Sequence, residues 1–190
     1  AESWRREPLD RRIAVAQQFA EITTRRRDEL AERISLETGK PGWEAESEAA
    51  LVPAKVKLSI EAHQRRCGGE DVTLPQGLGH TDYRPIGVMA VLGPFKFPAH
   101  LPNGHIVPAL IAGNAVLFKP SEKTPASGEM LVRCFHEAGI PEDVVQLVIG
   151  GPDEGKALVA HPGIDGVLFT GSAQAGIAIN RRLATNPAKI

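Results

Sequence analysis

Hydrophobic and polar positions follow a helical period in the first third of the chain. Between residues 9 and 66, apolar side chains recur every three or four positions among many charged ones, which predicts amphipathic helices. One helix is expected to stop at Gly39, which suits a left-handed cap, and before Pro41. A further helix is predicted over about 43–66. In this helix Pro53 either introduces a kink or marks the true start.

From Gly87 onward, short apolar runs alternate with helical stretches. The runs are "GVMAVL" (87–92), "NAVLF" (114–118), "VVQLVI" (144–149) and "IDGVLF" (164–169). Helices are expected near 101–112, from Pro125 with Thr124 as its cap, and over about 173–183. Strands that are apolar on both faces and alternate with helices predict an α/β fold, with a parallel Rossmann-like sheet covered by helices on both faces.

Two segments depart from this alternation. Residues 68–86 are rich in glycine and proline, and we interpret a short alternating stretch near "HTDYR" (80–84) as one connecting or edge strand. At "NPAKI" (186–190) a further strand is expected to begin, so the chain is expected to be cut within a sheet.

Composition narrows the class of protein. The 190 residues are 42% hydrophobic and 24% charged, and the net charge of −1 gives no electrostatic argument for a nucleic acid or an anionic membrane as partner. No apolar run is long enough to span a bilayer. Cys67 and Cys134 lie in unlike contexts without metal-ligand spacing, and the histidines are scattered, so no metal site is expected. We expect a reduced, cytoplasmic protein.

Candidate binding residues follow the predicted strands, where open parallel sheets bind ligands. "TGSAQAG" (170–176) places Gly171, Ser172 and Gly176 around a helix N-terminus, whose free N–H groups attract phosphate. It is neither a P-loop, because Ile177 replaces the required lysine, nor a G-x-G-x-x-G fingerprint. Glycine also serves simple turns at such positions, so phosphate binding and a plain turn both remain open.

A second candidate follows the second strand, where "KPSE" contains Lys119, Ser121 and Glu122. A lysine at a strand end is often only a solvated charge. With Glu122, however, Lys119 offers an ammonium and a carboxylate that could grip the hydroxyls of a ribose. A carboxylate there would repel a 2′-phosphate, which favours NAD over NADP.

Three stretches together resemble the aldehyde dehydrogenase superfamily in order and spacing. They are "GPFKFP…LPNGHIVPALIAGNAVLFKPSEKTP", "AGIPEDVVQLVIGG" and "GVLFTGSAQAG", and the similarity extends over about residues 4–190. Within the superfamily, "HLPNGHIVPAL" is most similar to the branch that acts on N-succinylglutamate semialdehyde in arginine catabolism. The resemblance implies NAD-dependent oxidation of the aldehyde to a carboxylic acid, through a cysteine thiolate and a glutamate general base. It also implies a homo-oligomer when full length.

The resemblance implies a role for each candidate residue. Lys119 and Glu122, with Ser121 between them, would hold the adenosine ribose, and Gly150 would lie near the adenine. Ser172, in the turn with Gly171 and Gly176, would contact the pyrophosphate. The wall of the cofactor cleft would be formed by Pro94 and Phe95.

The sequence departs from the family pattern in two respects. The family's nucleophilic cysteine and general-base glutamate come after the last residue of this chain, so no catalytic residue is expected in it, and the chain alone is expected to be inactive. Lys96 stands where the family has an asparagine that stabilises the oxyanion, and loss of such a donor costs about 10²–10³ in rate. Lys96 could point to solvent, reflect an error or substitution, or mark an impaired member.

Three segments are predicted on this basis. Residues 1–67 form an N-terminal helical segment of the cofactor-binding domain, 68–86 a connecting or oligomerisation strand segment, and 87–190 the NAD-binding α/β portion of an incomplete aldehyde dehydrogenase fold, truncated before the catalytic domain. A function of another class also remains open, namely a non-catalytic dinucleotide-binding or interaction module derived from the same fold.

Overall fold

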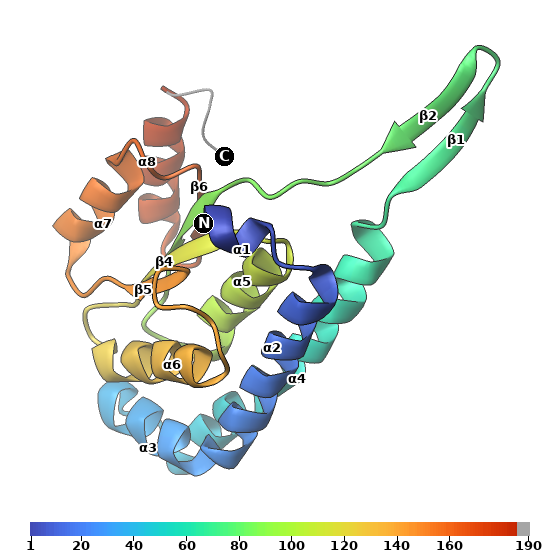
Figure 1. Cartoon of the computed structure of the whole chain (residues 1–190). Helices are drawn as coiled ribbons and strands as arrows, with labels where there is room; N and C mark the ends of the chain where they lie inside the picture. The colour runs from blue at the N-terminus through green and yellow to red at the C-terminus, as the bar shows by residue number, and fades with distance from the viewer. Residues whose placement is uncertain (186–190) are drawn as a thin grey trace.

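Four helices precede the first strand in the computed structural model, which describes residues 1–185 (Figure 1). They are α1 (Glu2–Arg5), α2 (Leu9–Arg25), α3 (Arg27–Thr38) and α4 (Gly42–Arg66). The predicted stop at Gly39 is confirmed, since its φ of 72° is the left-handed conformation that glycine tolerates. Helix α4 continues through Pro53, so the interpretation of Pro53 as a helix start is wrong.

A β-hairpin follows α4. Strands β1 (Glu70–Leu74) and β2 (Gly77–Thr81) pair antiparallel, with Leu74 opposite Gly77, and the hairpin projects from the body of the protein (Figure 1). The strand predicted near 80–84 corresponds in part to β2, which ends at Thr81, and β1 was not predicted. Because both faces of this hairpin are exposed, its strands carry no apolar face from which their bounds could be read.

The main sheet contains four parallel strands in the order β5-β4-β3-β6. The strands are β3 (Val88–Leu92), β4 (Ala115–Lys119), β5 (Val145–Leu147) and β6 (Gly166–Phe169). They alternate with helices α5 (His100–Ile111), α6 (Pro125–Glu137), α7 (Pro152–Ala160) and α8 (Ala173–Leu183). This confirms the predicted α/β fold, while α7 was not among the predicted helices. The strand expected at 186–190 lies outside the described residues.

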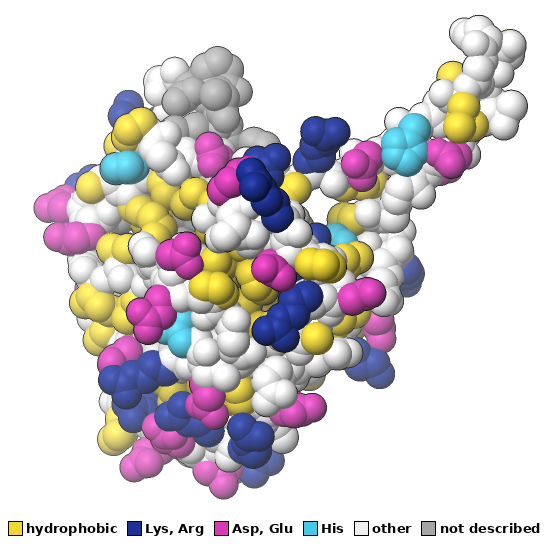
Figure 2. Space-filling view, in the orientation of Figure 1, with side chains coloured by type: hydrophobic (Ala, Val, Ile, Leu, Met, Phe, Trp, Pro, Cys, Tyr) yellow, Lys and Arg dark blue, Asp and Glu magenta, His cyan; other side chains and the backbone are white. Residues whose placement is uncertain are grey.

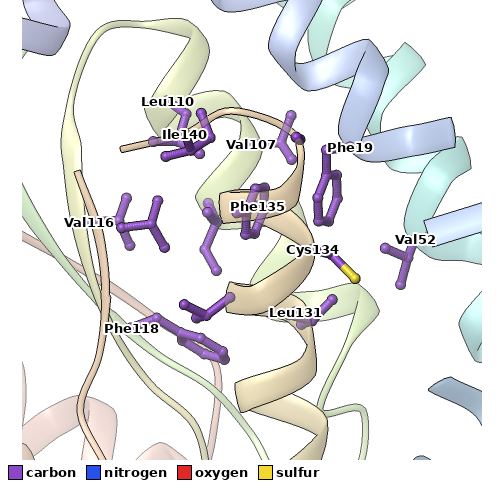
Figure 3. Packing of buried hydrophobic residues seen from close by; sticks show 14 of the residues in the cluster. Phe19, Val52, Val107, Leu110, Val116, Phe118, Leu131, Cys134, Phe135 and Ile140 are labelled. Atoms are coloured by element: carbon purple, nitrogen blue, oxygen red, sulfur yellow. The ribbon is translucent and has the colours of Figure 1, made fainter. Parts of the chain in front are cut away.

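Helices cover both faces of the sheet, and the strand period of two assigns side chains to each face. In β3, Met89 and Val91 belong to the hydrophobic cluster that includes residues of α2, α4, α5 and α6, whereas Ala90 and Leu92 belong to the cluster that includes residues of α7 and α8. Phe19 of α2 stacks on Phe135 of α6, with ring centroids 3.8 Å apart (Figure 3). The N-terminal helices therefore share one hydrophobic core with the sheet.

The strand order creates a site at one edge of the sheet. From β3, the chain first builds β4 and β5 on one side and later returns to place β6 on the other side. The connections after β3 and β6 therefore diverge, which leaves a crevice at the carboxyl ends of these strands. Within the described residues, no helix combines the length and apolar character needed to cross a bilayer.

Candidate functional site

A groove of about 1040 Å³ lies at the carboxyl ends of the parallel strands. Leu92 and Phe169, the last residues of β3 and β6, line it together with residues 119–123 after β4. Helices α7 and α8 contribute Val159 and Ile179, so apolar side chains make part of the wall. The groove thus occupies the crevice that the strand order creates.

Most of the predicted site residues come together here. The groove is lined by Pro94, Phe95, Lys119, Ser121, Glu122, Gly171 and Ser172. Gly150 and Gly176 do not line it, but each is next in the chain to a residue that does, Gly151 and Ala175. Gly150 lies against Glu154, because a Cβ on this glycine would be 2.3 Å from Glu154 Cγ.

Lys119 ends β4 and is only 7% exposed. Its Nζ donates to the carbonyl oxygen of Pro120 at 2.9 Å. Burial lowers the pKa of Lys119, while the charges of Glu122 and Glu154 act in the opposite direction. An ammonium has three N–H donors, so Lys119 retains donors for a ligand hydroxyl.

Glu122 is exposed, three residues beyond Lys119. Lys123 next to it places its Nζ 5.4 Å from the centre of the Phe95 ring, and both residues line the groove. The end of the groove near β4 therefore combines an anionic side chain with two cationic ones, an arrangement that can bind vicinal hydroxyls from both sides.

The Gly-Ser turn meets the groove at the start of α8. Ser172 is the N-cap residue, and its Oγ accepts a hydrogen bond from the backbone N–H of Ala175 at 3.2 Å. A Cβ on Gly171 would lie 2.4 Å from Cζ of Phe169, so this close approach requires glycine. Ser172 therefore caps α8. Because Ser172 and Ala175 also line the groove, the positive end of the helix dipole faces it.

Lys96 does not line the groove, although Pro94 and Phe95 do. Its side chain is exposed, with Nζ 5.7 Å from the centre of the Phe97 ring, and its carbonyl oxygen accepts a hydrogen bond from Lys40. Of the three interpretations of Lys96, an orientation toward solvent agrees with this geometry.

A buried carboxylate that was not predicted from the sequence lies behind this loop. Glu48 is 2% exposed and lies on the apolar stripe of α4, between Ala45, Ala49 and Val52, which are also buried. A charged residue at a core position of an amphipathic helix is the signal that could have identified it.

The two cysteines differ in their surroundings. Cys134 is buried, and this burial raises the pKa of its thiol to about 11, as in an inert structural cysteine. Cys67 is partly exposed at the end of α4.

His105 Nε2 lies 2.8 Å from Oγ1 of Thr170, which itself lines the groove, and burial lowers the pKa of His105. Within residues 1–185, no group of three or more His, Cys, Asp or Glu side chains could hold a metal ion.

Comparison with known proteins identifies the family. The model of the aldehyde dehydrogenase family matches residues 1–190. The chain belongs to the aldehyde dehydrogenase family. The predicted membership and the predicted parallel α/β fold are thereby confirmed.

Curated relatives also agree with the predicted branch of the family. The chain is 61% identical over 189 residues to N-succinylglutamate 5-semialdehyde dehydrogenase of Novosphingobium aromaticivorans, a match that covers 99% of this chain and 40% of that protein. The protein of the same name from Sphingopyxis alaskensis is 52% identical, and the match covers 98% of this chain and 39% of that protein. The chain thus spans about 40% of the length of these curated relatives.

Solved structures of family members have the same fold. An NAD-dependent aldehyde dehydrogenase from Sinorhizobium meliloti superposes with a TM-score of 0.93 at 29% identity, covering 100% of this chain and 38% of that one. NADP-dependent glyceraldehyde-3-phosphate dehydrogenase from Bacillus halodurans, solved with NADP, superposes with a TM-score of 0.88 at 29% identity. The match covers 95% of this chain and 40% of that one.

Proposed function

We propose that the groove binds NAD and that this chain supplies the cofactor-binding part of an enzyme that oxidises N-succinylglutamate 5-semialdehyde to the carboxylic acid. The observation that carries the proposal is the convergence of Lys119, Glu122 and the Ser172 turn on one groove at the carboxyl ends of the strands. The identity of 61% to a protein with this activity in its name supports the choice of aldehyde.

Each residue has a physical reason for its proposed role. Lys119 and Glu122 would bind the adenosine ribose hydroxyls as donor and acceptor, with Ser121 beside them. The N-terminus of α8, with Ser172, would bind the pyrophosphate. When bound, the nicotinamide of NAD supplies the hydride acceptor.

The remaining predicted residues would shape the groove. Pro94 and Phe95 present an apolar wall, which suits the flat face of a cofactor ring. Gly171 lets the chain pass close to Phe169, Gly176 lies in the first turn of α8, and Gly150 leads into the groove-lining Gly151.

The preference for NAD over NADP rests on the charge of Glu122. A carboxylate at the ribose would repel a 2′-phosphate. Lys123, Lys156 and Arg182 also line the groove, and a family member solved with NADP shows that the choice requires a direct test.

The test uses the full gene product that carries residues 1–190. We expect it to form NADH when given NAD and N-succinylglutamate 5-semialdehyde, with a lower rate for NADP. No NADH from this or related semialdehydes, despite calorimetric binding of NAD, would favour the non-catalytic dinucleotide-binding module instead. Absence of both binding and turnover would contradict the proposal.

We also propose that the protein forms a homo-oligomer through the β1–β2 hairpin. The hairpin projects from the body and carries hydrophobic side chains among polar ones (Figure 2). Val72, Leu74 and Leu78 are 46%, 45% and 69% exposed. A second copy of the chain would remove this apolar surface from water. The cytoplasmic location and the three predicted segments remain predictions.

A further inference from the structure

A buried ion pair lies behind the groove, between α3 and α4. Lys40 Nζ lies 2.8 Å from Glu48 Oε2, and the exposed fractions of the two side chains are 8% and 1%. Transfer of two charges out of water is costly, and it is offset only if further hydrogen bonds satisfy the remaining donors and acceptors. Lys40 Nζ also lies 3.7 Å from Glu44 Oε1. The further side-chain hydrogen bonds of Lys40 and Glu48 go to one segment and to its junction with α5.

That segment is the 94–99 loop, the residues that connect the end of β3 to α5. Glu48 Oε1 accepts the backbone N–H of Ala99 at 2.9 Å and that of His100 at 3.3 Å. These two N–H groups stand at the start of α5, where no intrahelical acceptor exists for them and where the helix dipole is positive. One oxygen of Glu48 therefore holds the junction between loop and helix.

Lys40 holds the middle of the same loop. Its Nζ donates to the carbonyl oxygen of Lys96 at 2.8 Å and lies 4.4 Å from the centre of the Phe97 ring. Within residues 1–185, the bond to Lys96 is the only hydrogen bond found between residues 94–98 and the rest of the chain. Burial of Pro98 and Ala99 also anchors the end of the loop, but the polar contacts that fix its middle come from the ion pair.

The loop reaches the groove through the same few residues. Pro94 and Phe95 line the groove, two residues and one residue before Lys96, whose carbonyl Lys40 binds. A displacement of the loop at Lys96 or Ala99 must therefore move the apolar wall, since the intervening segment is short. A misplacement of about 1 Å at a reacting centre can lower a rate about 10²-fold.

We propose that Glu48, through its ion pair with Lys40, is a positioning residue for the cofactor groove. It touches neither cofactor nor aldehyde, and it acts by holding the 94–99 loop so that Pro94 and Phe95 form a fixed wall. The inference rests on the proposed function, because it takes the groove to be the cofactor site.

The test compares two variants of the full gene product. Glu48→Gln keeps the shape of the side chain but removes the charge that pairs with Lys40. Trp4→Phe is the matched control, because it removes one buried hydrogen bond to the same helix, from Trp4 Nε1 to the carbonyl oxygen of Leu110 at 3.0 Å, at the opposite end of α5. If Glu48→Gln does not fold, Lys40→Arg keeps the charge and displaces the donor.

Two readouts separate positioning from general destabilisation. Hydrogen–deuterium exchange of the Ala99 and His100 amides, which donate to Glu48, should be faster in Glu48→Gln and unchanged in Trp4→Phe, because only the first substitution loosens the loop. The kcat for NADH formation should fall about 10-fold to 100-fold in Glu48→Gln, and in the control it should stay within about threefold. The KM for NAD should change by less than about threefold, because Lys119 and Glu122 remain in place.

Each result decides a separate point. Unchanged exchange of the loop in Glu48→Gln would overturn the inference, and so would faster exchange with unaltered kcat. Equal loss of kcat in both variants would mean that stability alone is responsible. If the unmodified protein neither binds NAD nor forms NADH, the proposed function fails, while the exchange measurement still decides whether Glu48 holds the loop.

Discussion

In the proposed cofactor site, Glu122 is the residue expected to set the choice between NAD and NADP. Its carboxylate is exposed in the groove beside the buried ammonium of Lys119. Replacement by glutamine should weaken NAD binding about 3-fold to 10-fold, because one charged acceptor for a ribose hydroxyl is lost. The same change should lower the preference for NAD over NADP about 10-fold, because repulsion of the 2′-phosphate disappears.

Calorimetric titration of each cofactor would measure this effect. Glu129→Gln is a suitable control, since Glu129 is also an exposed carboxylate, paired with Arg133 at 2.7 Å on α6, and it does not line the groove. An equal NAD-to-NADP ratio in the unmodified protein and in Glu122→Gln would contradict the role of Glu122.

Cys134 gives a prediction about pH. Burial raises the pKa of its thiol from an ordinary value of 9.0 to about 11, so the folded state keeps the proton where the unfolded state loses it. The stabilisation from this group is complete below pH 9 and is lost as pH rises from 9 to about 11. Denaturant unfolding at several pH values should show that the free energy of unfolding falls less between pH 9 and about 11 in Cys134→Ala than in the unmodified chain. An identical fall in both proteins would contradict the raised pKa of Cys134.

The start of α6 shows how one element depends on another. Thr124 occupies the predicted N-cap position, but its hydroxyl makes no capping bond and is buried without a partner in the described part of the chain. Glu37 of α3 caps the helix instead. Its carboxylate accepts the N–H groups of Ala126 and Ser127 at 2.7 and 2.8 Å, and the Ser127 hydroxyl at 2.6 Å.

Two substitutions distinguish these roles. Glu37→Gln should lower the free energy of unfolding by about 1–2 kcal/mol, because a charge-assisted cap at a helix N-terminus is lost. Thr124→Val should be neutral or stabilising, because it removes a buried hydroxyl that has no partner. Urea unfolding measures both. A larger loss in Thr124→Val than in Glu37→Gln would contradict this assignment of the cap.

Elements with a strong apolar period were predicted well, and weakly patterned ones were not. The face of α6 that carries Met130, Leu131, Cys134 and Phe135 is buried, because this apolar stripe leaves one way to pack the helix. Helix α7 buries only Leu158 and Val159, so its sequence carries little periodic signal. The hairpin strands bury no side chain, and no pattern could define their bounds.

At the scale of the whole molecule, the hairpin gives the prediction on assembly. Leu78→Asp places a charge on the apolar surface of the hairpin, and we expect the sedimentation coefficient of the full gene product to shift toward a smaller species. Leu36→Asp is the control, since Leu36 is 77% exposed on α3, in the body of the protein. An unchanged oligomer in Leu78→Asp, or equal dissociation in both variants, would contradict assembly through the hairpin.

The sequence alone determined the class of fold, the order of its parallel strands along the chain and the residues at the strand ends, because apolar period and turn residues are local properties. Only the tertiary structure decided which of these residues share one groove, and that Lys40 and Glu48 hold its loop. The strand order brings the ends of β3 and β6 together, although they are 77 residues apart in the chain (Leu92 and Phe169). Such proximity depends on packing between distant segments, and no local pattern encodes it.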